Sequence, residues 1–214
     1  MQNIILLAPP AAGKGTLAKL LCDKYNYVSV STGDILREEA KNNKSLSEKM
    51  KKGELIDDDT VFGLLKAKLN KLGNTPYILD GFPRTKKQAV MYDELLKSIG
   101  KSLGVVIYLD VDEKELINRI TTRVICPNCK RTYSLRDKNF YPKKKGLCDD
   151  CDVLLIHRED DKEEVFDKRY QEYLKSTSPL IHYYEKEGIL VRFTDYDARV
   201  ILDKVSSLVN VWLV

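Results

Sequence analysis

Near its start the chain has an apolar run that leads directly into a loop of small residues. Residues 3–8, NIILLA, show no regular polar alternation, which is typical of a strand buried on both faces of a sheet. The following residues, PPAAGKGT, enter a helical pattern over 14–24. A strand that turns into a helix directs backbone N–H groups and the helix N-terminus at one point. We therefore expect a phosphate-binding loop at the end of the first strand.

The rest of the chain alternates strand-like and helix-like segments. Further strands are predicted at YVSVS (27–31), PYILD (76–80), GVVIYLD (104–110) and GILVRF (188–193). Helices are predicted at 33–42, 59–72, 85–99, 113–122, 160–186 with a bend at Pro179, and 197–212. This alternation predicts an α/β fold, a doubly wound parallel five-stranded sheet flanked by helices.

Residues 124–157 do not follow this pattern and are expected to form an insertion. They contain two C-x₂-C pairs, CPNC at 126–129 and CDDC at 148–151. Pairs at this spacing are typical of a tetrahedral Zn²⁺ site, and four thiolates without an open position indicate a structural metal. The candidate ligands are Cys126, Cys129, Cys148 and Cys151. Iron or cobalt in place of zinc, two disulfides, or four free thiols remain alternatives.

The fifth cysteine, the two histidines and a run of lysines are not assigned to a metal or binding site. Cys22, on the apolar side of the first helix, is expected to be a core thiol, and His157 and His182 are not counted as metal ligands. The run of lysines at 143–145 is interpreted as a solvated turn.

Charge and composition narrow the function classes. The chain has 36 Lys and Arg against 32 Asp and Glu, a net charge of +4, which is low for a nucleic-acid-binding protein. We find no apolar stretch long enough to span a membrane, and the N-terminal run is too short for a secretory signal. The expectation is a cytoplasmic protein without membrane or nucleic-acid partners, whose five cysteines are thiols or metal ligands.

The small-residue loop departs from the usual G-x-x-x-x-G-K-[ST] pattern. Ala8 stands where the first glycine is expected, and Gly15 follows Lys14 where Ser or Thr would. A hydroxyl arrives only at Thr16, which we expect to cap the helix. Lys14 would place a mobile positive charge on the outer phosphates. Without further signals, a tight strand-to-helix connection that binds nothing is the alternative.

Three more motifs supply those signals: STGDILR at 31–37, GFPRT at 81–85, and Arg158 followed by Asp160 and Asp161. Together with the loop, they resemble the adenylate kinase family of nucleoside monophosphate kinases over the whole chain. In that family a glycine after the lysine is usual, whereas Ala8 and Ala11 replace glycines. The resemblance implies a monomer that transfers the γ-phosphoryl group of ATP to AMP, with Mg²⁺, giving two molecules of ADP.

The arginines support this resemblance. The chain contains 26 Lys but only 10 Arg, and guanidinium groups bind phosphate oxygens in pairs. Arg131, Arg136, Arg192 and Arg199 match no family motif. The resemblance implies that Lys14 and five arginines are catalytic: Arg37, Arg84, Arg123, Arg158 and Arg169. Ion pairs with the acidic run 159–164 are the alternative for some of them.

Binding roles follow from the same resemblance. It assigns ATP to Ala11, Ala12, Gly13, Lys14, Gly15, Thr16, Arg119, Arg123, Thr132 and Tyr133. It assigns AMP to Thr32, Arg37, Glu54, Leu55, Ile56, Gly81, Phe82, Pro83, Arg84, Gln88, Arg158 and Arg169, with Gln88 reading the base. Asp80 would orient Mg²⁺, and Asp110 would either act similarly or cap the following helix.

The implied division of the chain has a core interrupted by two closing segments. The core comprises 1–30, 57–121 and 160–214, the AMP-binding helical segment is 31–56, and the small zinc-bound, β-rich lid is 122–159. A UMP or CMP kinase remains an alternative, although Thr85 with Gln88 favours AMP. A zinc-ribbon nucleic-acid-binding NTPase is the alternative from another class.

Overall fold

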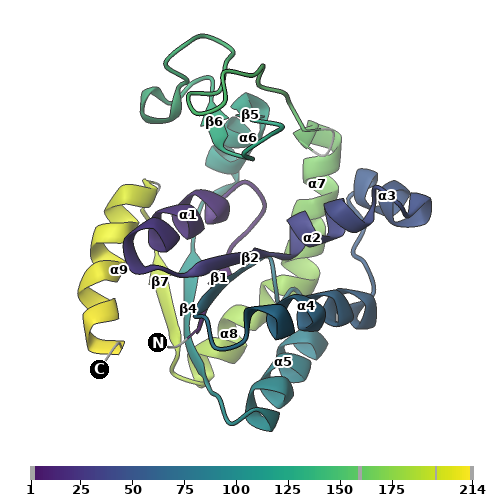
Figure 1. Ribbon diagram of the computed structural model, residues 1–214, viewed down its shortest axis with the longest axis vertical. Coiled ribbons are helices and arrows are strands. Elements are labelled where there is room, and N and C mark those ends of the chain that lie inside the picture. Colours follow the sequence, from purple (N-terminus) through teal and green to yellow (C-terminus); the bar gives the residue numbers. More distant parts are fainter. Residues whose placement is uncertain (1–2, 159–160, 196, 213–214) are drawn as a thin grey trace.

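A parallel sheet forms the centre of the molecule (Figure 1). The computed structural model describes residues 3–158, 161–195 and 197–212, and within these ranges the main sheet has five strands in the order β2-β3-β1-β4-β7. The strands are β1 (Asn3–Leu7), β2 (Val28–Ser31), β3 (Tyr77–Asp80), β4 (Leu103–Leu109) and β7 (Leu190–Phe193). Every pairing in this sheet is parallel. The predicted doubly wound α/β fold is confirmed.

Helices cover both faces of the sheet. They are α1 (Lys14–Tyr25), α2 (Thr32–Glu39), α3 (Lys44–Lys51), α4 (Asp58–Leu72), α5 (Lys86–Ser98), α6 (Glu113–Thr122), α7 (Glu163–Glu172), α8 (Pro179–Lys186) and α9 (Ala198–Trp212). Figure 1 shows α1 and α9 on one side of the strands, and α4, α5 and α8 on the other. None of the described helices is both long and apolar enough to cross a bilayer.

Alternate residues of β1 belong to two separate hydrophobic clusters. Ile4 and Leu6 pack in the cluster that includes α1, α6 and α9. Ile5 and Leu7 pack in the cluster that includes α4, α5 and α8. Because successive side chains of a strand point to opposite faces, both faces must be apolar. Burial of one such side chain stabilises the fold by roughly 1.5–3 kcal/mol.

The insertion folds as a separate small unit at the top of Figure 1, between α6 and α7. It contains the antiparallel pair β5 (Arg123–Ile125) and β6 (Thr132–Ser134), followed by a 3₁₀ turn at Lys138–Phe140. Its cluster of buried residues in the described part consists of Val124, Cys126, Tyr133 and Cys148. We call residues 123–157 the lid segment.

Two helical predictions need correction. Helix α3 was not predicted; its buried residue is Leu46, and the Asn43 side chain caps it by accepting from the Leu46 N–H at 3.1 Å. The predicted helix 160–186 is divided by a π-helical turn at 173–177, where Ser178 N–H donates to Tyr173 C=O at 2.8 Å. Pro179 has no N–H to donate to the preceding turn, and the π-helical turn ends shortly before it, although Ser178 keeps helical angles of φ −59° and ψ −30°. Asp160 and the predicted start of this helix lie outside the described residues.

Neither of the two residues considered as helix caps, Thr16 and Asp110, caps a helix. Helix α1 has Gly13 at its N-cap and no side-chain cap hydrogen bond, so Thr16 does not cap it. Helix α6 is capped by Asp112, which accepts from the Glu115 N–H at 3.0 Å. Asp110 instead accepts from the hydroxyl of Tyr108 and pairs with Arg192. The alternative that Asp110 caps the following helix is therefore excluded.

Candidate active site

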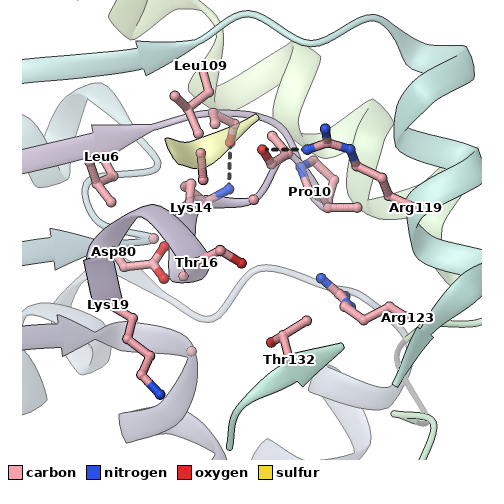
Figure 2. Close-up of a pocket in the computed structure, with 18 of the residues that line it drawn as sticks. Leu6, Pro10, Lys14, Thr16, Lys19, Asp80, Leu109, Arg119, Arg123 and Thr132 are labelled. Atoms are coloured by element: carbon pink, nitrogen blue, oxygen red, sulfur yellow. Dashed lines mark hydrogen bonds between the residues drawn. The ribbon is translucent and has the colours of Figure 1, made fainter. Parts of the chain in front are cut away.

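The loop between β1 and α1 is held in shape by its own lysine. Lys14 Nζ donates to the carbonyl oxygens of Ala8 at 3.0 Å and Pro9 at 2.8 Å. Arg119 donates from a terminal nitrogen to the Ala12 carbonyl at 3.2 Å. Figure 2 shows these two cations against the loop backbone. The first N–H groups of α1 are left without a side-chain cap, which is the arrangement that favours an anion at a helix start.

The two alanines that replace glycines differ in conformation. Ala11 has φ 64°, in the left-handed region that favours glycine, whereas Ala8 is not among the residues with positive φ. Ala8 is instead 7% exposed and belongs to a core cluster. The loop therefore keeps a glycine-like backbone at Ala11 in spite of the methyl group, and it needs no glycine at Ala8.

A cavity of about 1180 Å³ opens at the loop. Leu7, Asp80 and Leu109, at the carboxyl ends of β1, β3 and β4, line it, which is where parallel α/β sheets bind ligands. Of the described residues that line the cavity, thirteen are Lys or Arg and seven are Asp or Glu. This excess of positive charge suits a polyanionic ligand.

All six arginines that sequence analysis selected line this cavity: Arg37, Arg84, Arg119, Arg123, Arg158 and Arg169. Several are oriented by neighbours. Arg119 Nε lies 2.7 Å from a Glu115 oxygen, and Arg37 lies 2.7 Å from Asp34. Arg123 forms a two-pronged ion pair with Asp161, whose side chain is 2% exposed. The sequence alternative of ion pairs with the acidic run is therefore observed for Arg123 and, at 3.9 Å, for Arg169, although both residues also line the cavity.

Three further arginines that no sequence motif predicted contribute to the cavity wall. Arg131, Arg136 and Arg199 also line the cavity, so that nine of the ten arginines, all of them described, surround it. Arg199 lies on α9, and its guanidinium carbon is 5.9 Å from the ring centroid of Phe140 in the lid segment. No sequence motif contains these residues, because they meet the loop only through the fold.

The buried charges nearest the loop have shifted pKa values. Desolvation by burial lowers the pKa of Lys14 to about 8; the neighbouring Asp80 carboxylate opposes this shift, and Arg84 adds to it. Desolvation raises the pKa of Asp80, against the effect of Lys14. A β-carbon built at Gly15 would lie 3.6 Å from an Asp80 oxygen, so this carboxylate lies beside the first turn of α1. Thr16 lines the cavity nearby (Figure 2).

The predicted AMP residues divide into two groups. Arg37, Leu55, Gly81, Pro83 and Arg84 line the cavity together with Arg158 and Arg169. The others, Thr32, Glu54, Ile56, Phe82 and Gln88, do not line it, and all of these except the exposed Glu54 are buried. Their binding roles stay predictions.

Two of those buried side chains support the segment instead. Thr32 Oγ1 donates to the Gly81 carbonyl at 2.8 Å, joining α2 to the end of β3. Gln88 is 2% exposed; its oxygen accepts from the Arg84 N–H at 2.7 Å, and its nitrogen donates to Asp58 at 2.8 Å. An amide still has one donor and one acceptor left after these two bonds.

The four cysteines of the insertion lie together and fit a metal ion. Their Sγ atoms all lie within 4.8 Å of one another, and those of Cys129 and Cys148 are 3.6 Å apart. Four sulfurs bonded tetrahedrally at 2.3 Å would be about 3.8 Å apart. All five cysteines among the described residues are free, so the structure contains none of the alternative disulfides there. The backbone N–H of Cys129 also donates to Cys126 Sγ at 3.4 Å.

The surroundings of the fifth cysteine and of the two histidines agree with the interpretation from the sequence. Cys22 packs partly buried against the first core cluster, and burial raises its thiol pKa to about 11. His157 and His182 are exposed and are not part of the cysteine cluster. Thr132 and Tyr133 of β6 line the cavity beside Cys129, so the metal site and the cavity share a wall.

Comparisons with known proteins agree with this geometry. Residues 6–189 match the family model described as adenylate kinase. An adenylate kinase from Thermosipho africanus is 42% identical over 215 residues, covering 98% of this chain and 99% of the relative. One from Archaeoglobus fulgidus is 43% identical, covering 99% and 94%, and one from Methanothrix thermoacetophila is 39% identical, covering 98% and 99%. This chain belongs to the adenylate kinase family.

Proposed function

We propose that the protein catalyses the reversible transfer of the γ-phosphoryl group of ATP to AMP, giving two molecules of ADP. The observation that carries the proposal is the convergence of Lys14 and six arginines on one cavity at the carboxyl ends of the strands. Phosphoryl transfer needs little covalent chemistry from a protein. It needs two phosphate groups held in line and fixed cations around the charge of the transition state.

The loop side of the cavity suits the donor, ATP. Its phosphates would accept from backbone N–H groups of residues 11–16 and from the uncapped start of α1. Lys14 would exchange its two carbonyl partners, Ala8 and Pro9, for phosphate oxygens and follow the transferred group. Arg119, Arg123 and the lid residues Thr132 and Tyr133 would lie on the same nucleotide. Asp80 would orient the Mg²⁺ ion that accompanies ATP, and the ion would supply positive charge beside the phosphates.

The opposite side suits the acceptor, AMP. Arg37 and Arg84 would hold its phosphate, and Arg158 and Arg169 would bridge the two nucleotides. The base would lie against residues 53–56, with Gln88 reading adenine through the donor and acceptor that its two protein bonds leave over. We propose that segments 31–56 and 122–159 close over the core 1–30, 57–121 and 160–214 and exclude water. Residues 159–160 lie outside the described part.

The cysteine cluster suits one structural Zn²⁺ ion per chain. Cys126, Cys129, Cys148 and Cys151 would hold it, and the metal would tie together a segment that has few buried apolar side chains. We further propose that the protein is a cytoplasmic monomer with ATP, AMP and ADP as its partners and without nucleic-acid or membrane partners.

Comparing acceptors tests the function. ADP formation would be measured with ATP and Mg²⁺ plus AMP, UMP or CMP, and binding of a labelled oligonucleotide would be measured separately. We expect AMP to be the preferred acceptor and the oligonucleotide not to bind at physiological salt. A preference for UMP or CMP would move the protein to another monophosphate specificity. Oligonucleotide binding without ADP formation would reject the kinase proposal.

A further inference from the structure

Tyr133 contacts the cysteine cluster from within the lid segment. Its side chain is 2% exposed, and its hydroxyl oxygen lies 3.3 Å from Cys148 Sγ. The same oxygen accepts from the backbone N–H of Asp149 at 2.8 Å. A thiolate can only accept a hydrogen bond. Because the N–H of Asp149 already points at the oxygen, the hydroxyl proton of Tyr133 is directed at the sulfur when Cys148 is a metal-bound thiolate.

The tyrosine ring is held in place from two sides. Its residue pairs with Val124 across the β5–β6 ladder. The guanidinium carbon of Arg131 lies 5.0 Å from the ring centroid, within the range of a cation–π contact. Arg131 is fixed in turn by ion pairs to Asp150 at 2.7 Å and to Asp149 at 3.3 Å. The hydroxyl of Tyr133 therefore has a defined direction.

The same small group of residues forms part of the cavity wall. Cys129, Arg131, Tyr133 and Asp149 all line the cavity on the side of the lid segment. The cysteine cluster therefore adjoins the cavity wall directly through Cys129 and through the side chain of Tyr133.

We propose that Tyr133 is a positioning residue of the metal site: its hydroxyl donates to the Cys148 thiolate and connects the bound metal to the cavity wall. This inference rests on the proposed metal site. Outer groups that hydrogen-bond to metal ligands orient those ligands and tune their donor strength, and removing one typically costs about 10–100-fold in metal affinity.

Chelator competition for Zn²⁺ tests the affinity. Tyr133→Phe keeps the ring and removes only the hydroxyl, so we expect its zinc affinity to be about 10–100-fold lower than that of the natural protein. The matched control is Tyr141→Phe, which changes a tyrosine of the same segment that is 42% exposed and should leave the affinity unchanged. Thermal unfolding of the metal-loaded proteins verifies that both variants are folded.

The absorption spectrum of the Co²⁺-loaded protein separates a hydrogen bond from packing. A hydrogen bond lowers the energy of the sulfur lone pair, so its loss should move the sulfur-to-cobalt charge-transfer band of Tyr133→Phe to longer wavelength. Tyr141→Phe should keep the natural spectrum. If the natural protein binds neither metal, the metal site itself is rejected. If it binds them and Tyr133→Phe shows the same affinity and the same band, the metal site stands and the role of Tyr133 is rejected.

Discussion

The two walls of the cavity are stabilised in different ways. The loop wall is backed by a sheet whose two faces are covered by large apolar clusters. In the described lid segment, the corresponding cluster has four fully buried members, and two of them are Cys126 and Cys148. Ordering a residue costs roughly 1–2 kcal/mol of backbone entropy, so this small cluster cannot by itself offset the ordering of residues 123–157. One wall is maintained by hydrophobic burial, and we propose that the other is maintained by a metal ion on the four cysteines.

The two walls should therefore respond differently to substitution. A change in the loop wall should alter the chemistry of the cavity and leave the fold intact. A change among the cysteines should alter the order of one segment and affect the chemistry only through poorer closure.

Loss of one cysteine ligand should have the largest effect. Structural zinc sites in small peptides contribute apparent binding free energies of about 10–16 kcal/mol, so Cys148→Ala or Cys129→Ala should lose the metal. Proteolysis should then cut first between residues 124 and 157, while the sheet stays folded. Metal content, limited proteolysis and the melting temperature measure these effects. AMP affinity is the internal control, because Arg37 and Arg84 lie outside the lid segment.

The contrast between the two walls depends on this outcome. If a cysteine variant loses metal yet keeps natural melting and natural protection of the lid segment, the metal does not stabilise that wall. If the whole sheet unfolds instead, the two walls are not independent.

Replacing the loop lysine should give the next largest effect, on turnover and on ATP binding but not on the fold. Lys14→Met removes a cation from the transferred group, which typically costs roughly 3–4 kcal/mol, or about 10²–10³-fold or somewhat more in kcat. Because Lys14 makes its hydrogen bonds only to the carbonyl oxygens of Ala8 and Pro9 among the described contacts, melting and metal content should stay natural. Near-natural kcat in a folded variant would remove Lys14 from the mechanism.

The sequence predicted those parts of the molecule that depend on local pattern. All five strands of the main sheet lie at the segments predicted for them, and the cysteine cluster follows from spacing. Helix α3 was missed because its apolar content is too small to give a helical period, with Leu46 buried and Met50 packed partly buried beside it. The cap at Thr16 was wrongly predicted because α1 already begins at Lys14, so its N-cap is Gly13, which has no side chain to accept a hydrogen bond.

Tertiary contacts account for the rest of what the sequence could not give. Arg131 and Arg199 come from the lid segment and from α9, which meet at the cavity only in the fold. The buried state of Gln88 depends on Asp58, thirty positions away in sequence. A pattern read along the chain contains neither kind of information.

The pH dependence of ATP binding tests the loop wall more finely. Burial lowers the pKa of Lys14 to about 8, so the protein without bound ATP should lose this proton as the pH rises above that value. ATP requires the charged form, and its affinity should therefore fall by about tenfold, or 1.4 kcal/mol, between pH 7 and pH 9. Calorimetric titration at fixed Mg²⁺ measures it.

Lys14→Met provides the control for this titration. Its ATP affinity should be lower at pH 7 and should stay nearly constant between pH 7 and pH 9. An equally steep fall in this variant would assign the pH dependence to another group.

The smallest effects are expected at the two loop alanines. Replacing each of them by glycine should change the free energy of unfolding in opposite directions. Ala11 has φ 64°, where an alanine costs about 1–2 kcal/mol relative to glycine, while the greater freedom of glycine in the unfolded chain costs about 0.4–1 kcal/mol. Ala11→Gly should therefore raise the free energy of unfolding by up to about 1 kcal/mol.

Ala8 is 7% exposed in a core cluster and has no positive φ. Ala8→Gly should lower the free energy of unfolding by about 1 kcal/mol. It removes a buried methyl group and increases the conformational freedom of the unfolded chain, and both changes destabilise the fold. In both variants ATP affinity should change little, since Lys14 and Gly13 keep their positions. Denaturant unfolding and ATP titration of the two variants measure these differences, and a shift of the same sign in both would show that the left-handed backbone at Ala11 is not what distinguishes them.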